Sequence, residues 1–162
     1  MKDDEARAAA DAILDPQELA RRVFVAMEAN DRVFHALGMR VVEIGPGRAV
    51  LEMTVREDML NGHDICHGGM IFSFADTAMA IASNSFNQTS VASAADISFL
   101  EPARKGEVLR AETEQQSLRK RTALYDVTVS GRDGRVIALF RGRTQRVNAK
   151  VVSELPGPTD DL

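Results

Sequence analysis

Residues 61–80 read Asn61-Gly-His-Asp-Ile-Cys-His-Gly-Gly-Met-Ile-Phe-Ser-Phe-Ala-Asp76-Thr-Ala-Met-Ala80, a polar loop with glycines that runs into an apolar segment. From Gly68 to about Asn84 the segment is apolar nearly all round, which is typical of a helix buried in a core. Because one face of a β-sheet has to be covered, we expect the remaining strands to wrap this helix. The helix should therefore lie at the centre of the fold.

One carboxylate, Asp76, lies in the middle of this apolar helix. A buried acid is costly unless it is paired, hydrogen-bonded or functional. At the helix start, the N–H groups of Gly68 and Gly69 have no partner inside the helix, and the helix dipole favours negative charge there. Such donors and a carboxylate are two parts of an acyl-transfer site. Roughly 10–12 Å along the helix axis separates Gly68 from Asp76, so we expect a second chain to complete the site.

The composition is that of a soluble protein with one domain. The chain has 162 residues, of which 44% are hydrophobic and 27% charged. A net charge of −4 argues against a nucleic-acid partner, and a single cysteine fits a reducing compartment. No signal peptide and no apolar run long enough to span a bilayer is visible, so we expect a cytoplasmic protein with no membrane partner.

The flanking sequence predicts an N-terminal helix and an antiparallel sheet. Asp15-Pro16 is a typical helix start, with the aspartate as cap. Alternating patterns between turn signals predict strands, which short connections would pair antiparallel. The expected strands are residues 41–44, 49–55, 91–100, 107–117, 122–130 and 135–147. The chain is thus divided into a flexible N-terminal segment (1–14), a single domain (15–147) and a flexible C-terminal tail (148–162).

The same residues carry a resemblance to a known family. Asn61, the pattern His67-Gly68-Gly69…Asp76, the strand Val91–Leu100 and the run Ala138–Gly142 resemble the PaaI-type hotdog-fold acyl-CoA thioesterases. The resemblance covers roughly residues 34–147. It implies an α+β hotdog fold, in which a long central helix is wrapped by a five- or six-stranded antiparallel sheet. It also implies a homodimer with two sites at the subunit interface, commonly paired into a homotetramer.

The resemblance implies a role for each site residue and no cofactor. Asp76 would act as general base or nucleophile, and the N–H of Gly68 would polarise the thioester carbonyl. Asn61 and His67 would position water and the thioester, and Thr77 would hold the acid or the water. From the residues themselves, the further candidates for substrate binding are Gly69, the small residues Ser93 and Ala94, and the basic turn Arg119-Lys120-Arg121. This turn could grip the phosphates of coenzyme A, or it could simply be a solvated turn.

Other interpretations of the loop remain open. Asn61 precedes a glycine and could serve only the turn. Cys66 beside His67 suggests a Cys–His nucleophile, but adjacent residues rarely face each other and a lone cysteine is usually a small apolar filler. The spacing of His63 and Asp64 relative to the following cysteine and histidine matches no zinc pattern, so we expect no metal.

The sequence therefore predicts a hydrolase of acyl-CoA thioesters. The resemblance implies aromatic acyl groups of the hydroxyphenylacetyl type as the substrates, with medium aliphatic chains as the alternative. Two alternatives stay open. The same fold could hold an acyl-CoA without cleaving it, as a binding module. It could also act as a hydratase or dehydratase next to the thioester, although the required arrangement of a histidine with an acid has less support in the sequence.

Overall fold

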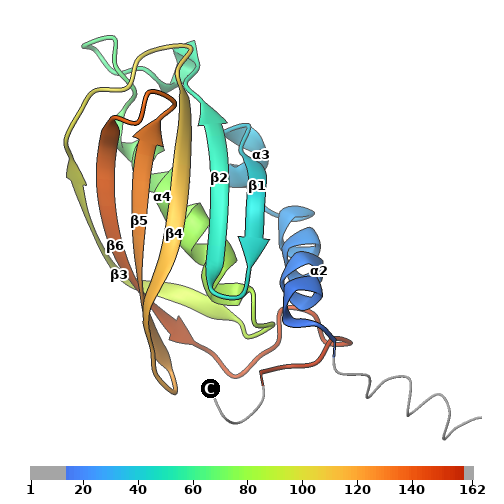
Figure 1. The fold of residues 1–162 in the computed structure, drawn as a ribbon. Coiled ribbons are helices and arrows are strands. Elements are labelled where there is room, and N and C mark those ends of the chain that lie inside the picture. Colours follow the sequence, from blue (N-terminus) through green and yellow to red (C-terminus); the bar gives the residue numbers. More distant parts are fainter. Residues whose placement is uncertain (1–13, 159–162) are drawn as a thin grey trace, which may run out of the picture.

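The computed structural model describes residues 14–158. Six strands form one antiparallel sheet, and the long helix α4 (Gly68–Asn84) lies against one face of it (Figure 1). Helix α2 (Pro16–Glu28) packs against the first strand and α4, and the short helix α3 (Arg32–Ala36) contacts α4 as well. The predicted hotdog fold, with an N-terminal helix, is thus confirmed. The segment expected to be flexible, residues 1–14, lies outside the described residues except for Leu14.

The order of the strands in the sheet differs from their order in the chain. The strands are β1 (Arg40–Gly45), β2 (Arg48–Thr54), β3 (Ser90–Phe99), β4 (Val108–Leu118), β5 (Thr122–Gly131) and β6 (Val136–Arg146). Their spatial order is β1-β2-β4-β5-β6-β3, and all neighbours run antiparallel. A single 3-10 turn, η1 (Glu57–Met59), precedes the loop that leads into α4. Among residues 14–158, strand β3 consequently forms an edge of the sheet and pairs with β6 alone.

Local sequence signals set both ends of the helices. The carboxylate of Asp15 accepts a hydrogen bond from the N–H of Glu18 at 3.2 Å, and the following proline begins α2, as expected for a capped start. At the start of α4, Nδ1 of His67 accepts from the N–H of Gly69 at 2.9 Å. At its end, the side-chain amide of Asn84 donates to the carbonyl of Ser90 at 3.0 Å. This last bond ties the helix to the first residue of β3.

The hydrophobic core lies between α4 and the sheet. Phe74, Ala78 and Met79 on the helix are almost completely buried, as are Leu51 and Val127 on the strands. The all-round apolar character of the helix is explained by this position, because the sheet and α2 cover most of its circumference.

The sheet approaches α4 very closely at Gly142 of β6. A Cβ atom added there would lie 2.2 Å from Sδ of Met79 and 2.8 Å from Cε1 of Phe140, both of which are buried. Because Gly142 has no side chain, Met79 can pack directly against β6. Met79 follows Asp76 by one helical turn, so this close contact lies one turn from the acid on the same helix.

Gly142→Ala is expected to destabilise the protein by about 1–3 kcal/mol, because a well-packed core would have to accept an extra methyl group. The measurement is urea unfolding of the variant and the wild type. Gly62→Ala is the matched control, since a Cβ at Gly62 would meet no atom within 4 Å. Equal losses of stability in the two variants would contradict the close approach at Gly142.

A buried side chain, that of Asn87, helps to bind the chain after β6 to the body. Asn87, in a left-handed conformation with φ of 56°, donates from its amide to the carbonyls of Val152 at 2.9 Å, Leu155 at 3.1 Å and Pro156 at 3.0 Å. Its side-chain oxygen accepts from the N–H of Val152 at 2.8 Å. Residues 148–158 contain neither helix nor strand. Nothing in the sequence indicated these contacts, and the flexibility expected for this tail stays a prediction.

Candidate active site

A groove of about 480 Å³ opens at the N-terminus of α4. It lies where the loop before the helix meets the segment after β3. Most of its lining side chains are apolar, and Gly68 contributes backbone to its wall. The lining residues are Asn61, Ile65, Cys66, Gly68, Ile71, Phe99, Leu100, Glu101, Pro102 and Ala103.

The N–H of Gly68 is a free donor at the wall of this groove. The N–H of Gly69 is taken by the imidazole of His67, and that of Met70 donates to the carbonyl of His67 at 2.9 Å. Within residues 14–158, no acceptor lies in hydrogen-bond range of the Gly68 N–H. The ring of Phe99 covers this position so closely that a Cβ at Gly68 would lie 2.9 Å from its Cζ. The arrangement presents one unoccupied amide, at the positive end of a helix, to an apolar groove.

Asn61 and His67 both hold the loop in front of the helix. The side-chain oxygen of Asn61 accepts from the N–H of His63 at 2.9 Å and from that of Ile65 at 3.4 Å. This is a local turn of the kind that asparagine favours. His67 caps α4 through Nδ1. These contacts give both side chains a structural task in the single chain, and their expected contacts with water and thioester stay predictions.

Asp76 is half-buried and its carboxylate lacks a hydrogen bond or ion pair within residues 14–158. Burial raises the pKa of Asp76 above the usual range of an aspartate. The neighbouring hydroxyl of Thr77 is occupied, because it donates to the carbonyl of Ser73 at 2.8 Å. The groove at Gly68 does not include Asp76, and eight residues of helix, about 12 Å, separate the two. One chain alone therefore does not bring the donor and the acid together.

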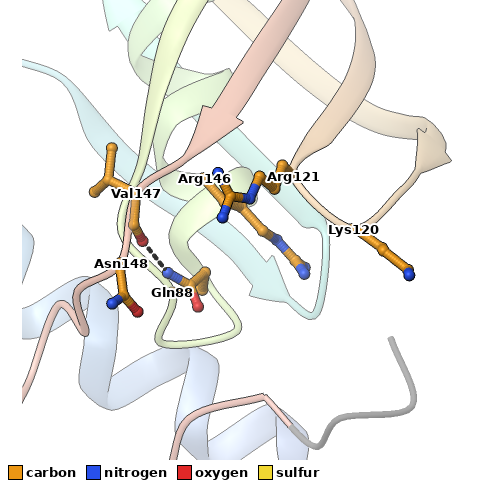
Figure 2. A pocket seen from close by; sticks show the side chains of 6 residues that line it. All are labelled: Gln88, Lys120, Arg121, Arg146, Val147 and Asn148. Atoms are coloured by element: carbon orange, nitrogen blue, oxygen red, sulfur yellow. Dashed lines mark hydrogen bonds between the residues drawn. The ribbon is translucent and has the colours of Figure 1, made fainter.

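The expected substrate-binding residues fall into two separate places. Ser93 and Ala94 are exposed on the edge strand β3, and neither belongs to the groove. Lys120 and Arg121 line a second hollow of about 390 Å³ at the end of the β4–β5 hairpin (Figure 2). Arg119 does not line it, and its guanidinium donates to the carbonyl of Leu118 at 3.1 Å.

Sequence reasoning missed Gln88 and Arg146, which also line that second hollow. Arg146 ends β6 and Gln88 lies in the connection between α4 and β3. Only the pairing of β5 with β6 brings Arg146 beside Arg121, where its N–H donates to the Arg121 carbonyl at 2.8 Å. The sequence carries no signal for this neighbourhood.

Cys66 is buried, and burial raises the pKa of its thiol to about 11. A protonated thiol is a poor nucleophile, which agrees with the interpretation of this residue as an apolar filler. Across residues 14–158, no three histidine, cysteine, aspartate or glutamate side chains come together in a way that suits a metal ion. The helices in that range are all too short or too polar to cross a membrane.

The raised pKa of Asp76 makes stability depend on pH. Below the ordinary aspartate value the carboxyl is neutral in both the folded and the unfolded chain, so its burial costs little. As the pH rises through the higher folded pKa, a buried charge has to be maintained and the folded state loses stability. We expect Asp76→Asn to be more stable than wild type at neutral pH, and the difference to shrink toward about pH 4. Urea unfolding of both proteins across this pH range measures the difference in their free energy of unfolding. A difference that does not change with pH would contradict the prediction.

Comparisons with known proteins agree with this geometry. A family model described as "Thioesterase superfamily" matches residues 63–138, which include most of the loop, α4, the strands β3, β4 and β5, and the start of β6. The acyl-coenzyme A thioesterase PaaI of Escherichia coli K12 is 42% identical over 129 residues, which is 80% of this chain and 92% of that protein. The solved structure of E. coli PaaI, from the phenylacetic acid degradation operon, superposes with a TM-score of 0.83 at 40% identity, covering 84% of this chain and 99% of that one.

Two further solved structures extend the comparison. A variant of the phenylacetic acid degradation protein PaaI from Thermus thermophilus has a TM-score of 0.70 at 36% identity, and covers 72% of this chain and 100% of its own. A Streptococcus mutans protein bound to acetyl CoA shares the fold alone, with a TM-score of 0.67 at 21% identity over 69% of this chain and 90% of its own. The chain described here therefore belongs to the thioesterase superfamily, as a PaaI-type hotdog thioester hydrolase.

Proposed function

We propose that this protein hydrolyses acyl-CoA thioesters to the free acid and coenzyme A, at sites that two copies of the chain form together. One observation carries the proposal. Within the described part of the chain, the same helix presents an amide without an acceptor, at Gly68, and two turns later a half-buried carboxylate without a partner, at Asp76. Both groups are costly to leave unsatisfied, and a thioester with an attacking water would satisfy both.

The edge strand β3 supports the pairing of two chains. Nine of its ten residues are partly or fully exposed, including Val91 and Phe99 at 51% and 52%. A long edge with unpaired backbone groups and apolar side chains favours pairing with another strand. Two β3 strands related by a two-fold axis would run antiparallel, and so would the two α4 helices beside them. The N-terminus of each α4 would then face the middle of the other.

In such a dimer the two halves of the chemistry come from different chains. The Gly68 N–H of one chain would donate to the thioester carbonyl oxygen, where negative charge develops. Asp76 of the other chain would take a proton from the attacking water and pass it to the sulfur of coenzyme A, which leaves as the free thiol. Alternatively, Asp76 would attack the carbonyl itself and expel coenzyme A as the thiolate, and water would then hydrolyse the acyl–Asp76 anhydride, which releases the free acid, restores the carboxylate and supplies the proton of the thiol. Asn61 and His67 would hold the loop that carries the amide, and Thr77 would keep the helix turn beside the acid in place.

We further propose aromatic acyl groups of the hydroxyphenylacetyl type as substrates. The groove beside Gly68 is mostly apolar, and the ring of Phe99 forms one of its walls, which suits a flat apolar group. The phenylacetic acid degradation context of the E. coli and T. thermophilus relatives points the same way. We also propose a dimer of dimers in the cytoplasm, and light scattering on the purified protein measures the assembly.

The direct test is a panel of acyl-CoAs, with phenylacetyl, hydroxyphenylacetyl, medium-chain and acetyl groups, in which release of free thiol is followed. We expect the aromatic thioesters to have the highest kcat/KM. A preference for aliphatic chains would contradict the proposed acyl group but not the reaction. Tight binding without turnover of any thioester would favour the binding module, and hydration of an enoyl-CoA would favour the hydratase.

A further inference from the structure

The groove at Gly68 contains one charged side chain. Among the described residues that line it, Glu101 alone carries a charge, and Asn61 is the only other one with a side-chain oxygen or nitrogen. The oxygen of Asn61 is already used inside its own loop, where it accepts from the N–H groups of His63 and Ile65. The carboxylate of Glu101 therefore sets the charge of an otherwise neutral and mostly apolar groove.

Backbone hydrogen bonds on both sides hold Glu101 in the wall of the groove. The N–H of Glu101 donates to the carbonyl of Ile137, near the start of β6, at 3.3 Å. Two residues later, Ala103 is almost completely buried, and its carbonyl accepts from the N–H of Cys66 at 2.8 Å. These bonds join the segment after β3 to β6 and to the loop before α4. The fold therefore determines where the side chain of Glu101 leaves the backbone.

The negative charge of Glu101 is not neutralised within residues 14–158, where no ion pair or hydrogen bond uses its carboxylate. The guanidinium of Arg135 lies near, because it donates to the carbonyl of the next residue at 3.3 Å. Its charge is shared by Glu107 at 2.9 Å and Asp133 at 2.6 Å. Arg104, three residues further along the chain, is exposed and does not line the groove. A ligand in the groove therefore meets an uncompensated negative charge.

We propose that Glu101 selects acyl groups by the charge at their far end. It favours a neutral acyl group that ends in a hydroxyl and rejects one that ends in a carboxylate. Apolar walls alone penalise both kinds of polar end, because each loses its water on entry. A carboxylate in the wall separates the two, since it accepts a hydrogen bond from a hydroxyl and repels a second carboxylate. The inference rests on the proposed function, which places the acyl group in this groove.

The repulsion between two carboxylates is large enough to control selectivity. At the effective dielectric constant near a protein surface, two unit charges about 6 Å apart change an equilibrium by about tenfold or more. The effect does not require Glu101 to touch the substrate, because charge acts over several ångströms. It should disappear when the charge is removed without a change in the shape of the side chain.

The first experiment compares phenylacetyl-CoA, 4-hydroxyphenylacetyl-CoA and 4-carboxyphenylacetyl-CoA by kcat/KM for the release of free thiol. Glu101→Gln removes the charge and keeps an acceptor oxygen. It should raise kcat/KM for the carboxylated thioester about tenfold or more and leave that for phenylacetyl-CoA within about twofold. Glu101→Lys should raise the value for the carboxylated thioester further. Glu101→Leu also removes the acceptor, and should abolish a preference for the hydroxylated over the plain ring that Glu101→Gln retains.

Glu114→Gln is the matched control for these variants. Glu114 is exposed on β4 and lies outside the groove, so its replacement makes the same change in net charge at a distance. The ratio of kcat/KM values among the three thioesters should stay as in wild type. Glu101 is exposed as well, so its variants should fold. An equal change for all three thioesters in Glu101→Gln would mean that the carboxylate acts on the coenzyme A part that they share, and would overturn the proposal.

The second experiment measures selectivity without turnover. Its probes are ketone analogues of the same three thioesters, in which a methylene group between the sulfur and the carbonyl prevents cleavage. By calorimetry, Glu101→Gln should bind the carboxylated analogue about tenfold or more tightly than wild type does, and the phenylacetyl analogue equally. If this shift occurs but no thioester is cleaved, the proposed reaction is refuted and the selectivity of Glu101 stands. If thioesters are cleaved and the shift is absent, the reaction stands and the role of Glu101 is refuted.

Discussion

Asp76→Asn is expected to lower kcat for acyl-CoA hydrolysis by about 10²–10⁴-fold, the usual contribution of a positioned base. Asparagine keeps the shape of the side chain but cannot accept a proton from water or attack the carbonyl as a carboxylate would. Since the carboxylate makes no hydrogen bond within residues 14–158, the substitution removes no described contact and the fold should persist. The measurement is steady-state release of free thiol, with circular dichroism to confirm folding.

Asp126→Asn is a suitable control for this prediction. Asp126 is a carboxylate of β5 that is fully engaged with Arg141, through bonds of 2.6 and 2.7 Å, and it lines neither the groove at Gly68 nor the second hollow at the end of the β4–β5 hairpin. Its loss should leave kcat near the wild-type value. Equal rates of thiol release by the Asp76→Asn variant and the wild type would show that Asp76 takes no part in the reaction.

Gly68→Pro is expected to lower kcat by about 10²–10³-fold, the effect of deleting one donor to a developing oxyanion. Proline lacks the N–H, yet the first position of a helix tolerates it well. The preceding residue, His67, already has φ of −61° and ψ of 134°, which is the conformation favoured before proline. The backbone should therefore accept the substitution while the groove loses its donor.

Gly68→Ala isolates the contribution of that donor. Both substitutions add a Cβ that pushes on the ring of Phe99, but only proline removes the N–H. We expect the alanine variant to retain substantially more activity than the proline variant at equal protein stability. If the two variants have the same kcat, the crowding at Phe99 explains the loss and the amide has no catalytic role.

Mixing the Asp76→Asn variant with the Gly68→Pro variant tests whether each site takes residues from both chains. Asp76→Asn and Gly68→Pro are each expected to be nearly inactive alone. After subunit exchange, half of the dimers are mixed, and in each of these one site has both intact parts, so about a quarter of the wild-type rate should return. No recovery in a mixture shown to exchange subunits would place the acid and the amide of one site in the same chain.

Local patterns predicted much of this fold. The glycine pair after His67, followed by an apolar run, predicted the start of α4, and the structure begins that helix at Gly68. Asp15-Pro16 marked the start of α2 in the same way. These signals succeed because caps and periodicity act within a few residues of the chain.

Contacts between distant segments could not be read in this way. The placement of β3 beside β6 depends on how α4 crosses the sheet, and the composition of β3 does not indicate which strand it will pair with. The binding of the tail by Asn87 and the meeting of Arg121 with Arg146 depend on that same global arrangement. The basic turn was visible in the sequence, but the arginine that completes its pocket lies 25 residues further along the chain (146 − 121).

The exposed edge of β3 has a consequence for how such a protein behaves at low abundance. If every site needs two chains joined along this edge, turnover per molecule falls steeply once the concentration drops below the dissociation constant of the dimer. Newly made chains would be inactive until enough copies accumulate to form dimers, and dilution would reversibly abolish the activity by dissociating the dimers. The edge strand would thus make catalysis respond to the level of expression without any separate regulator.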